Sequence, residues 1–168
     1  MKYNYKKRWL VEKKLKGLQE NLKRILIDNS SLTSRVAEKK NPIKLISSRT
    51  YLTKQKDKSS KKYSLVREVK IQGYLDNDVI AKSTIPVQQI TGQLTYIKFL
   101  GNKSLATLLF KKPIFFKESI EYIVKQNHVV RITFFKRKKH TIKVEERFPI
   151  HNNYEYMNLI KCRQNIIY

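Results

Sequence analysis

The chain has 168 residues, 40% of them hydrophobic, and a formal net charge of +24. Its length leaves no room for a second full domain, because domains mostly run to ~100–200 residues, and its apolar share excludes global disorder. Its one cysteine, Cys162, excludes an internal disulfide and a cysteine metal cluster, and no apolar run approaches the ~20 residues of a membrane span. We expect a single monomeric domain over residues 1–168, with its core in residues 18–150.

The excess of positive charge has two interpretations. A nucleic acid or an acidic membrane is the usual partner of so basic a protein. However, the basic residues are mostly Lys, Gly and Pro number only four each, and Tyr numbers ten. Lys and Tyr, like the abundant Ile and Asn, have A- and T-rich codons, so an AT-rich genome such as an organelle's accounts for the composition. We therefore expect no nucleic-acid partner, and Lys side chains spread over loops and outer strand faces.

The first third of the chain predicts two helices and a strand. Apolar residues at helical spacing indicate an amphipathic helix over residues 18–28. The serine pair at 30–31 supplies N-cap side chains for a second short helix over residues 32–36. Residues 43–52 are strand-like, and residues 54–62 contain no apolar side chain, which is typical of a loop.

The rest of the chain predicts a sheet. Alternating apolar and polar residues indicate strands at 63–71, 79–85, 114–124, 129–135 and 141–148. The first two form a hairpin, and Ser104 is a candidate N-cap for a short helix over residues 105–110. The expected fold class is α+β, an antiparallel sheet with helices packed on one side. The tail after Pro149 gives no clear signal.

Two charged residues stand in apolar rows of these strands. Alternate residues of a strand share one face, so Arg67 lies among apolar residues in the strand 63–71, and Glu146 does so in the strand 141–148. The two could form a buried salt bridge with each other, or a bulge could turn one of them outward. They could also line a pocket for a polar ligand, since buried ion pairs are poor stabilisers. The pattern alone leaves these interpretations open.

Two predicted helix starts add backbone donors. The first turn of a helix has unpaired N–H groups that favour an anion, and Leu32 and Leu105 occupy such positions, after Ser31 and Ser104. Most helix starts are merely capped. These two would form a carboxylate site only if they converge on Arg67.

Five short blocks make the chain resemble the chorismate lyase family and its plastid-encoded relatives. They are LIDNSSLTSRV at 26–36, LVREVKI at 65–71, VIAKSTIP at 79–86, LGNKSLATLLF at 100–110 and VEERFP at 144–149. Each block is weak alone, but their order and spacing are specific. The resemblance implies an enzyme that eliminates pyruvate from chorismate to leave 4-hydroxybenzoate, in a pocket enclosed by the sheet and its helices.

The resemblance also assigns roles to the residues in question. Arg67 would pair with the ring carboxylate, Glu146 would face the hydroxyl end of the ring, and the N–H groups of Leu32 and Leu105 would help to bind the carboxylate. The reaction makes the ring aromatic, so it implies no metal, no cofactor and no nucleophile. The resemblance implies that the partner is the small molecule chorismate. It also implies location in the plastid stroma, or else in a bacterial cytoplasm, and quinone biosynthesis as the pathway that consumes the product.

Three departures from the family pattern stand beside this assignment. Ala106 replaces a usual glycine, residues 136–139 form a basic turn where the family has a glycine-containing one, and Glu145 adjoins Glu146, so that a one-residue shift in register would exchange the two.

Two rival functions follow from the same residues. One is a non-catalytic ligand-binding module of the same fold, and the other is an RNA-binding protein. His128, His140 and His151 fit no metal or catalytic pattern.

Overall fold

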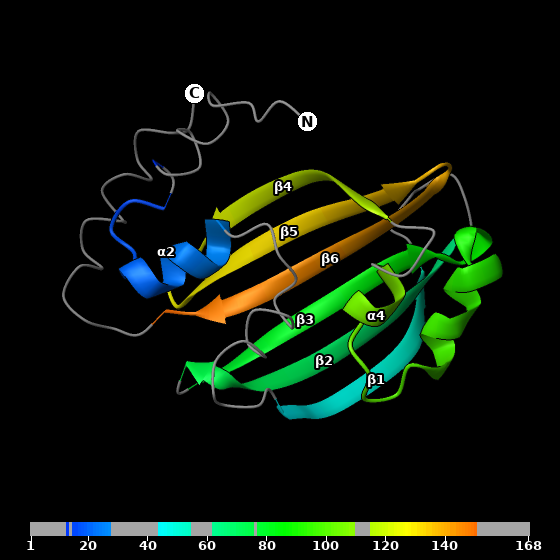
Figure 1. The fold of residues 1–168 in the computed structure, drawn as a ribbon, viewed down its shortest axis with the longest axis horizontal. Coiled ribbons are helices and arrows are strands. Elements are labelled where there is room, and N and C mark those ends of the chain that lie inside the picture. Colours follow the sequence, from blue (N-terminus) through cyan, green and yellow to red (C-terminus); the bar gives the residue numbers. More distant parts are fainter. Residues whose placement is uncertain are drawn as a thin grey trace.

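The computed structural model describes residue 13 and residues 15–27, 44–54, 62–75, 77–109 and 115–150. Within these ranges the chain forms one six-stranded antiparallel sheet of order β1-β2-β3-β6-β5-β4 (Figure 1). The strands are β1 (Lys44–Lys54), β2 (Tyr63–Leu75), β3 (Asn77–Pro86), β4 (Phe116–Val124), β5 (His128–Arg137) and β6 (His140–Pro149). The expected helix at 32–36, and with it Leu32, lies outside the described residues, as do Cys162 and His151.

Each half of the sheet is a run of three consecutive strands, and the halves join where β3 pairs with β6. The chain passes from one half to the other through two short 3-10 helices, η1 (Val87–Gln89) and η2 (Gly92–Phe99), and the helix α4 (Ala106–Leu109). The N-terminal helix α2 (Glu20–Ile27) is shorter than the predicted one, because Leu18 belongs to the turn that precedes it. None of the helices in the described part of the chain has the length and apolar character needed to span a bilayer.

The helices cover one face of the sheet in two separate clusters, toward opposite ends of it (Figure 1). One cluster packs the apolar side of α2 against residues that include Val69 and Phe148. The other packs η2 and α4 against residues that include Leu65 and Phe115. Leu65 and Val69 are separated by an even number of positions in β2, so their side chains, and with them both clusters, lie on the same face of the sheet. The predicted α+β arrangement, with helices on one side of an antiparallel sheet, is therefore what these residues form.

Arg67 lies between Leu65 and Val69, where neither apolar cluster covers the sheet. The buried polar residues of the inner face gather in this interval; they are Arg67, Ser83, Arg131, Thr133 and Glu146. Hydrogen-bonded register places Arg67 opposite Ser83, Ser83 opposite Val144, and Val144 opposite Thr133. The inner face thus has a polar centre between two apolar ends.

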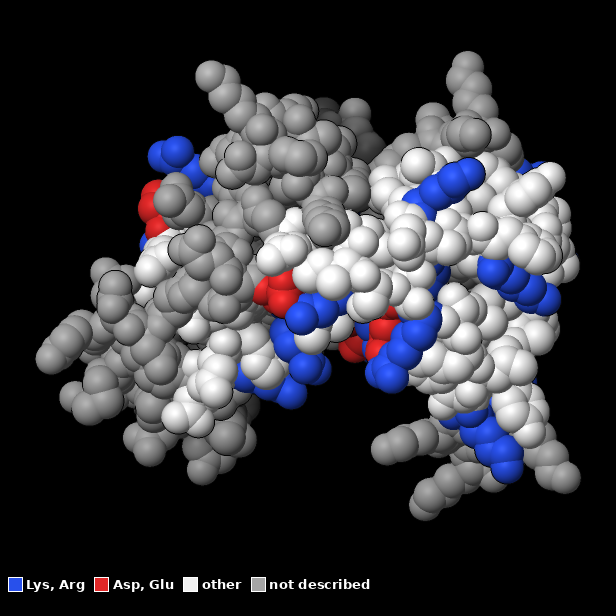
Figure 2. Space-filling model, turned by 90° about the horizontal axis from the view of Figure 1, so that it is seen from below, with Lys and Arg blue, Asp and Glu red and all other residues white. Residues whose placement is uncertain are grey.

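The basic side chains of the described residues are dispersed. In Figure 2 they stand in separate groups, with acidic side chains beside some of them. On the outer face Arg49, Glu68, Lys82 and Glu145 lie opposite one another in register on β1, β2, β3 and β6, so that charges of opposite sign alternate across the sheet. On the side shown, this pattern agrees with the expectation that Lys residues occupy outer strand faces rather than one continuous stripe.

Candidate active site

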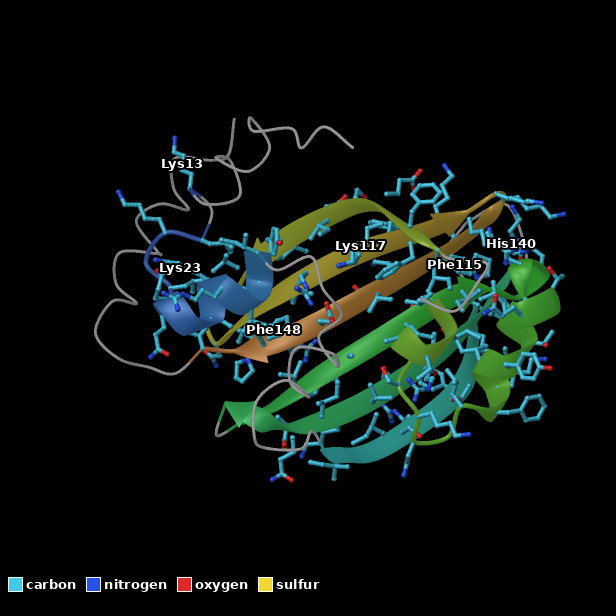
Figure 3. The ribbon with its side chains drawn as sticks, in the orientation of Figure 1. Lys13, Lys23, Phe115, Lys117, His140 and Phe148 are labelled. Atoms are coloured by element: carbon cyan, nitrogen blue, oxygen red, sulfur yellow. The ribbon has the colours of Figure 1, made fainter. Side chains whose placement is uncertain are left out.

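A hollow lies over the polar centre of the sheet in the described part of the chain. Its empty space, taken out to the open mouth, is about 670 Å³. Its polar lining residues are Ser104, in the loop before α4, and six residues of the strands β2, β3, β4, β5 and β6, namely Arg67, Ser83, Lys117, Arg131, Thr133 and Glu146. Figure 3 shows Lys117 between Phe148 and Phe115, which mark the two apolar ends of the same face.

Arg67 is buried, with 2% of its surface exposed. Its Nη2 donates to the carbonyl oxygens of Gly101 at 2.9 Å and Lys103 at 2.7 Å, in the loop before α4. Burial lowers the pKa of Arg67, but a guanidinium keeps its proton in proteins. The donors on Nε and Nη1 have no acceptor among the described residues, and no carboxylate in that part of the chain pairs with Arg67. The side chain is therefore a positive charge with donors left for an anion.

Glu146 is buried as well, and its partner is Arg131. The Arg131 Nε donates to Glu146 Oε2 at 2.6 Å, because the two residues lie directly opposite each other on β5 and β6. Arg131 Nη1 also donates to the carbonyl oxygens of Ile25 at 3.0 Å and Leu26 at 3.3 Å, in the last turn of α2. Arg131 thus fixes the Glu146 carboxylate and joins α2 to the sheet.

Arg67 and Glu146 do not pair with each other. Across the sheet, Arg67 on β2 is in register with Val144 on β6, two strands away, and Glu146 is two residues after Val144 on β6. At ordinary strand spacing, this offset separates the Cα atoms of Arg67 and Glu146 by about 12 Å. Both line the same hollow. The interpretation that the two residues form a salt bridge with each other is therefore wrong. Neither residue is turned outward by a bulge.

Leu105, at the start of the loop-to-helix turn before α4, also lines the hollow. Ser104 Oγ accepts a hydrogen bond from Ala106 N at 3.1 Å, as expected of an N-cap, and the Leu105 carbonyl accepts from Leu108 and Leu109. The Leu105 N–H donates to no acceptor in the described part of the chain. Leu105 and Arg67 line one hollow, so these two predicted positions converge, while Leu32 lies outside the described residues.

The register of β6 separates the adjacent glutamates. Glu145 is partly exposed on the outer face and pairs with Lys143 at 3.0 Å, whereas Glu146 faces the hollow. Neither described histidine lines the hollow: His140 bonds Thr91 Oγ1 at 2.9 Å, and burial, with Arg147 and Lys125 nearby, lowers the pKa of His128. Among the described residues no group of three or more His, Cys, Asp or Glu side chains could hold a metal ion.

Comparison with known proteins now bears on these positions. The family described as chorismate lyase matches residues 4–149, which is most of the chain. The chain belongs to the chorismate lyase family. No match was found among the curated proteins. The resemblance seen in the sequence blocks is confirmed, and the positions at which it places functional groups in a chorismate lyase, Arg67, Glu146 and Leu105, line one hollow.

Two departures from the family pattern have different structural consequences. Lys138, in the basic turn, is the only non-glycine among the described residues with a positive φ, at 50°. A side chain there is strained, whereas the glycine of the family turn would not be. Ala106 begins α4 without a positive φ, so the missing glycine leaves that turn unstrained. β5 runs to Arg137, which makes the turn shorter than the predicted 136–139.

Two charged residues that line the hollow, Arg131 and Lys117, were not predicted from the sequence. Val130 and Ile132, the neighbours of Arg131 in β5, belong to the opposite face of the strand. That face has the more apolar row, so the sequence pattern predicts that it, and not the face with Arg131, points inward. Lys117 precedes a register shift in β4 between residues 117 and 119, which breaks the alternation. The pKa of Lys117 is lowered to about 8, mainly by burial and also by the charge of Arg131, while the charge of Glu146 partly offsets both effects.

Proposed function

We propose that the chain is a chorismate lyase, which eliminates pyruvate from chorismate to leave 4-hydroxybenzoate. Membership of the chorismate lyase family supports the reaction class. The observation that supports it most strongly is the buried Arg67, which bonds two backbone carbonyls among the described residues and lines a hollow that Glu146 also lines. A buried cation without a carboxylate partner is costly in a protein, and a ligand carboxylate would offset that cost.

In this proposal Arg67 binds the ring carboxylate of chorismate. A guanidinium can bond both oxygens of a carboxylate at once. Leu105 lines the same hollow, and in this proposal its N–H is an additional donor. The apolar side chains of Val69, Ala81 and Val144, which also line the hollow, contact the faces of the ring. These contacts fix the orientation of a planar product, and the ring carboxylate needs no further counter-charge.

Glu146 then lies at the hydroxyl end of the ring. The elimination breaks the bond between the ether oxygen and ring carbon 3, and ring carbon 4, which bears the hydroxyl group, loses its hydrogen as a proton. The electrons of that C–H bond complete the aromatic ring, and the ether oxygen leaves as enolpyruvate, which becomes pyruvate. A carboxylate at this end can accept the hydroxyl hydrogen bond and stabilise positive charge on the departing proton. Arg131 holds that carboxylate in place.

The reaction driving force lies in the substrate, because the product ring is aromatic. The protein contribution is geometry and charge complementarity. A buried, rigidly held pair such as Arg131 and Glu146 needs no reorganisation when the substrate arrives.

The test is incubation of the purified protein with chorismate. We expect 4-hydroxybenzoate and pyruvate to appear in equal amounts, measured by ultraviolet absorbance and by lactate dehydrogenase coupling, at a rate above spontaneous decay. With Arg67→Met, the rate of product formation should fall to the rate of spontaneous chorismate decay. Tight binding of 4-hydroxybenzoate without any turnover would instead indicate a ligand-binding module of the same fold. RNA binding at physiological salt, with a steep salt dependence, would favour the nucleic-acid interpretation.

A further inference from the structure

Lys117 is a charged residue of the hollow to which the proposed reaction has assigned no task. It lies on the inner face of β4, opposite Phe135 on β5, and its Nζ is 5.9 Å from the centre of the Phe135 ring. Its side chain lines the hollow together with Arg131 and Glu146, and the charges of both act on it. Lys136, next to Phe135 on β5, does not line the hollow and pairs with Glu118 at 2.6 Å, and both of those side chains are 41% exposed.

The substrate of the proposed reaction has a second carboxylate. Chorismate has one on the ring and one on the enolpyruvyl group, and that group is attached to the carbon beside the hydroxyl-bearing carbon. If Arg67 binds the ring carboxylate and Glu146 faces the hydroxyl, the enolpyruvyl carboxylate lies on the Glu146 side of the ring. Arg131 is already bonded to Glu146 and to the end of α2. Lys117 is another cation that lines the hollow among the described residues, and its charge interacts with those of Arg131 and Glu146.

The charge of the hollow agrees with a dianionic ligand. Its charged lining residues are three cations, Arg67, Lys117 and Arg131, and one anion, Glu146, which gives a net charge of +2. Without Lys117 the charge would be +1, which matches 4-hydroxybenzoate, with its single carboxylate. Because hydrogen bonds to charged groups are strong in a site of low dielectric, the additional cation favours the ligand with two carboxylates.

We infer that Lys117 binds the enolpyruvyl carboxylate of chorismate and thereby makes the pocket prefer the substrate over the aromatic product. This inference rests on the proposed function. It predicts a selective effect of substitution: Lys117→Met keeps the length of the side chain and removes its charge. We expect KM for chorismate to rise about 10- to 100-fold, the usual effect of losing one hydrogen bond to a charged group. The Kd for 4-hydroxybenzoate should stay within about twofold, because that ligand makes no use of Lys117.

A pH profile and a conservative variant separate charge from packing. The groups around Lys117 include Phe135 and Arg131 on β5 and Glu146 on β6. Because the pKa of Lys117 is about 8, kcat/KM of the wild type should fall as pH rises through that value. Lys117→Arg should keep its activity to higher pH, since an arginine stays charged. Lys136→Met, on the neighbouring strand, serves as the matched control and should change neither constant.

A stable probe keeps the inference testable apart from turnover. The ligand 3-(carboxymethoxy)-4-hydroxybenzoate has both carboxylates and no enol ether to eliminate. Calorimetry should show that the wild type prefers it to 4-hydroxybenzoate and that Lys117→Met loses this preference. If the wild type shows the preference but converts no chorismate, the proposed reaction fails while the Lys117 assignment stands. If Lys117→Met weakens both ligands equally, or neither, the assignment is overturned.

Discussion

The ion pair between Arg131 and Glu146 predicts a stability difference between the two buried arginines. Arg131→Met leaves the Glu146 carboxylate buried without its partner at 2.6 Å. Stranding one member of a buried pair costs about 3–5 kcal/mol, a large part of the ~5–15 kcal/mol by which domains are stable. The variant also leaves the carbonyl oxygens of Ile25 and Leu26 at the end of α2 without their donor.

Arg67→Met should cost less, because no carboxylate is stranded. The two carbonyls that lose a donor belong to Gly101 and Lys103, which are exposed and can bind water instead. At ordinary hydrogen-bond values this loss is about 1–2 kcal/mol. The free energy of unfolding, measured by urea denaturation at pH 7, should therefore be lower for Arg131→Met than for Arg67→Met by about 2 kcal/mol or more.

A double variant tests the reason for that difference. Adding Glu146→Leu to Arg131→Met removes the stranded charge, so it should recover much of the lost stability. Recovery should be incomplete, because the α2 carbonyls still lack their donor. Equal stability losses for Arg131→Met and Arg67→Met, or no recovery in the double variant, would refute the view that Arg131 neutralises Glu146 while Arg67 has no carboxylate partner among the described residues.

Two further predictions concern residues outside the pocket. Lys138→Gly should raise the free energy of unfolding by about 1 kcal/mol, because it relieves the side-chain strain of a positive φ; an unchanged or lower value in urea denaturation would count against this reading of the turn. Hydrogen bonds from Tyr51 and Arg49 hold the pKa of Glu68 below its ordinary value. A lowered folded-state pKa stabilises the fold above the ordinary carboxyl pKa, and this contribution is lost as the pH falls through the folded-state pKa. As the pH is lowered from neutral to below the ordinary carboxyl range, the free energy of unfolding of Glu68→Gln should therefore fall less than that of the wild type. An equal fall in both proteins would contradict the lowered pKa of Glu68.

The strands and two of the site residues could be predicted from the sequence because alternation is a local property. Arg67 and Glu146 each interrupt a row of apolar residues, and a buried row is visible wherever its opposite row is polar. Arg131 escapes this reasoning because Ile132, on the opposite face, is buried too, so neither row of β5 is plainly the outer one. Lys117 escapes it because a bulge changes the parity of β4.

The contacts that give these residues their roles depend on tertiary structure. Arg67 bonds carbonyl oxygens 34 and 36 residues away along the chain, and Arg131 bonds a helix end 106 residues away. No local pattern specifies such partners. The family resemblance predicted that Arg67 and Glu146 face one ligand without predicting that Arg131 holds Glu146, and location in a plastid stroma stays a prediction.

Binding of 4-hydroxybenzoate tests most directly the claim that Arg67 and Glu146 serve one ligand. We expect calorimetry to show one binding site per chain in the wild type. Arg67→Met should weaken binding by about 100-fold, the effect of losing a charge-assisted carboxylate contact. Lys70→Met, on the outer face of the same strand, should bind as the wild type does, and a melting curve should show that both variants are folded. Wild-type binding that is absent, or that survives unchanged in a folded Arg67→Met variant, would contradict the claim.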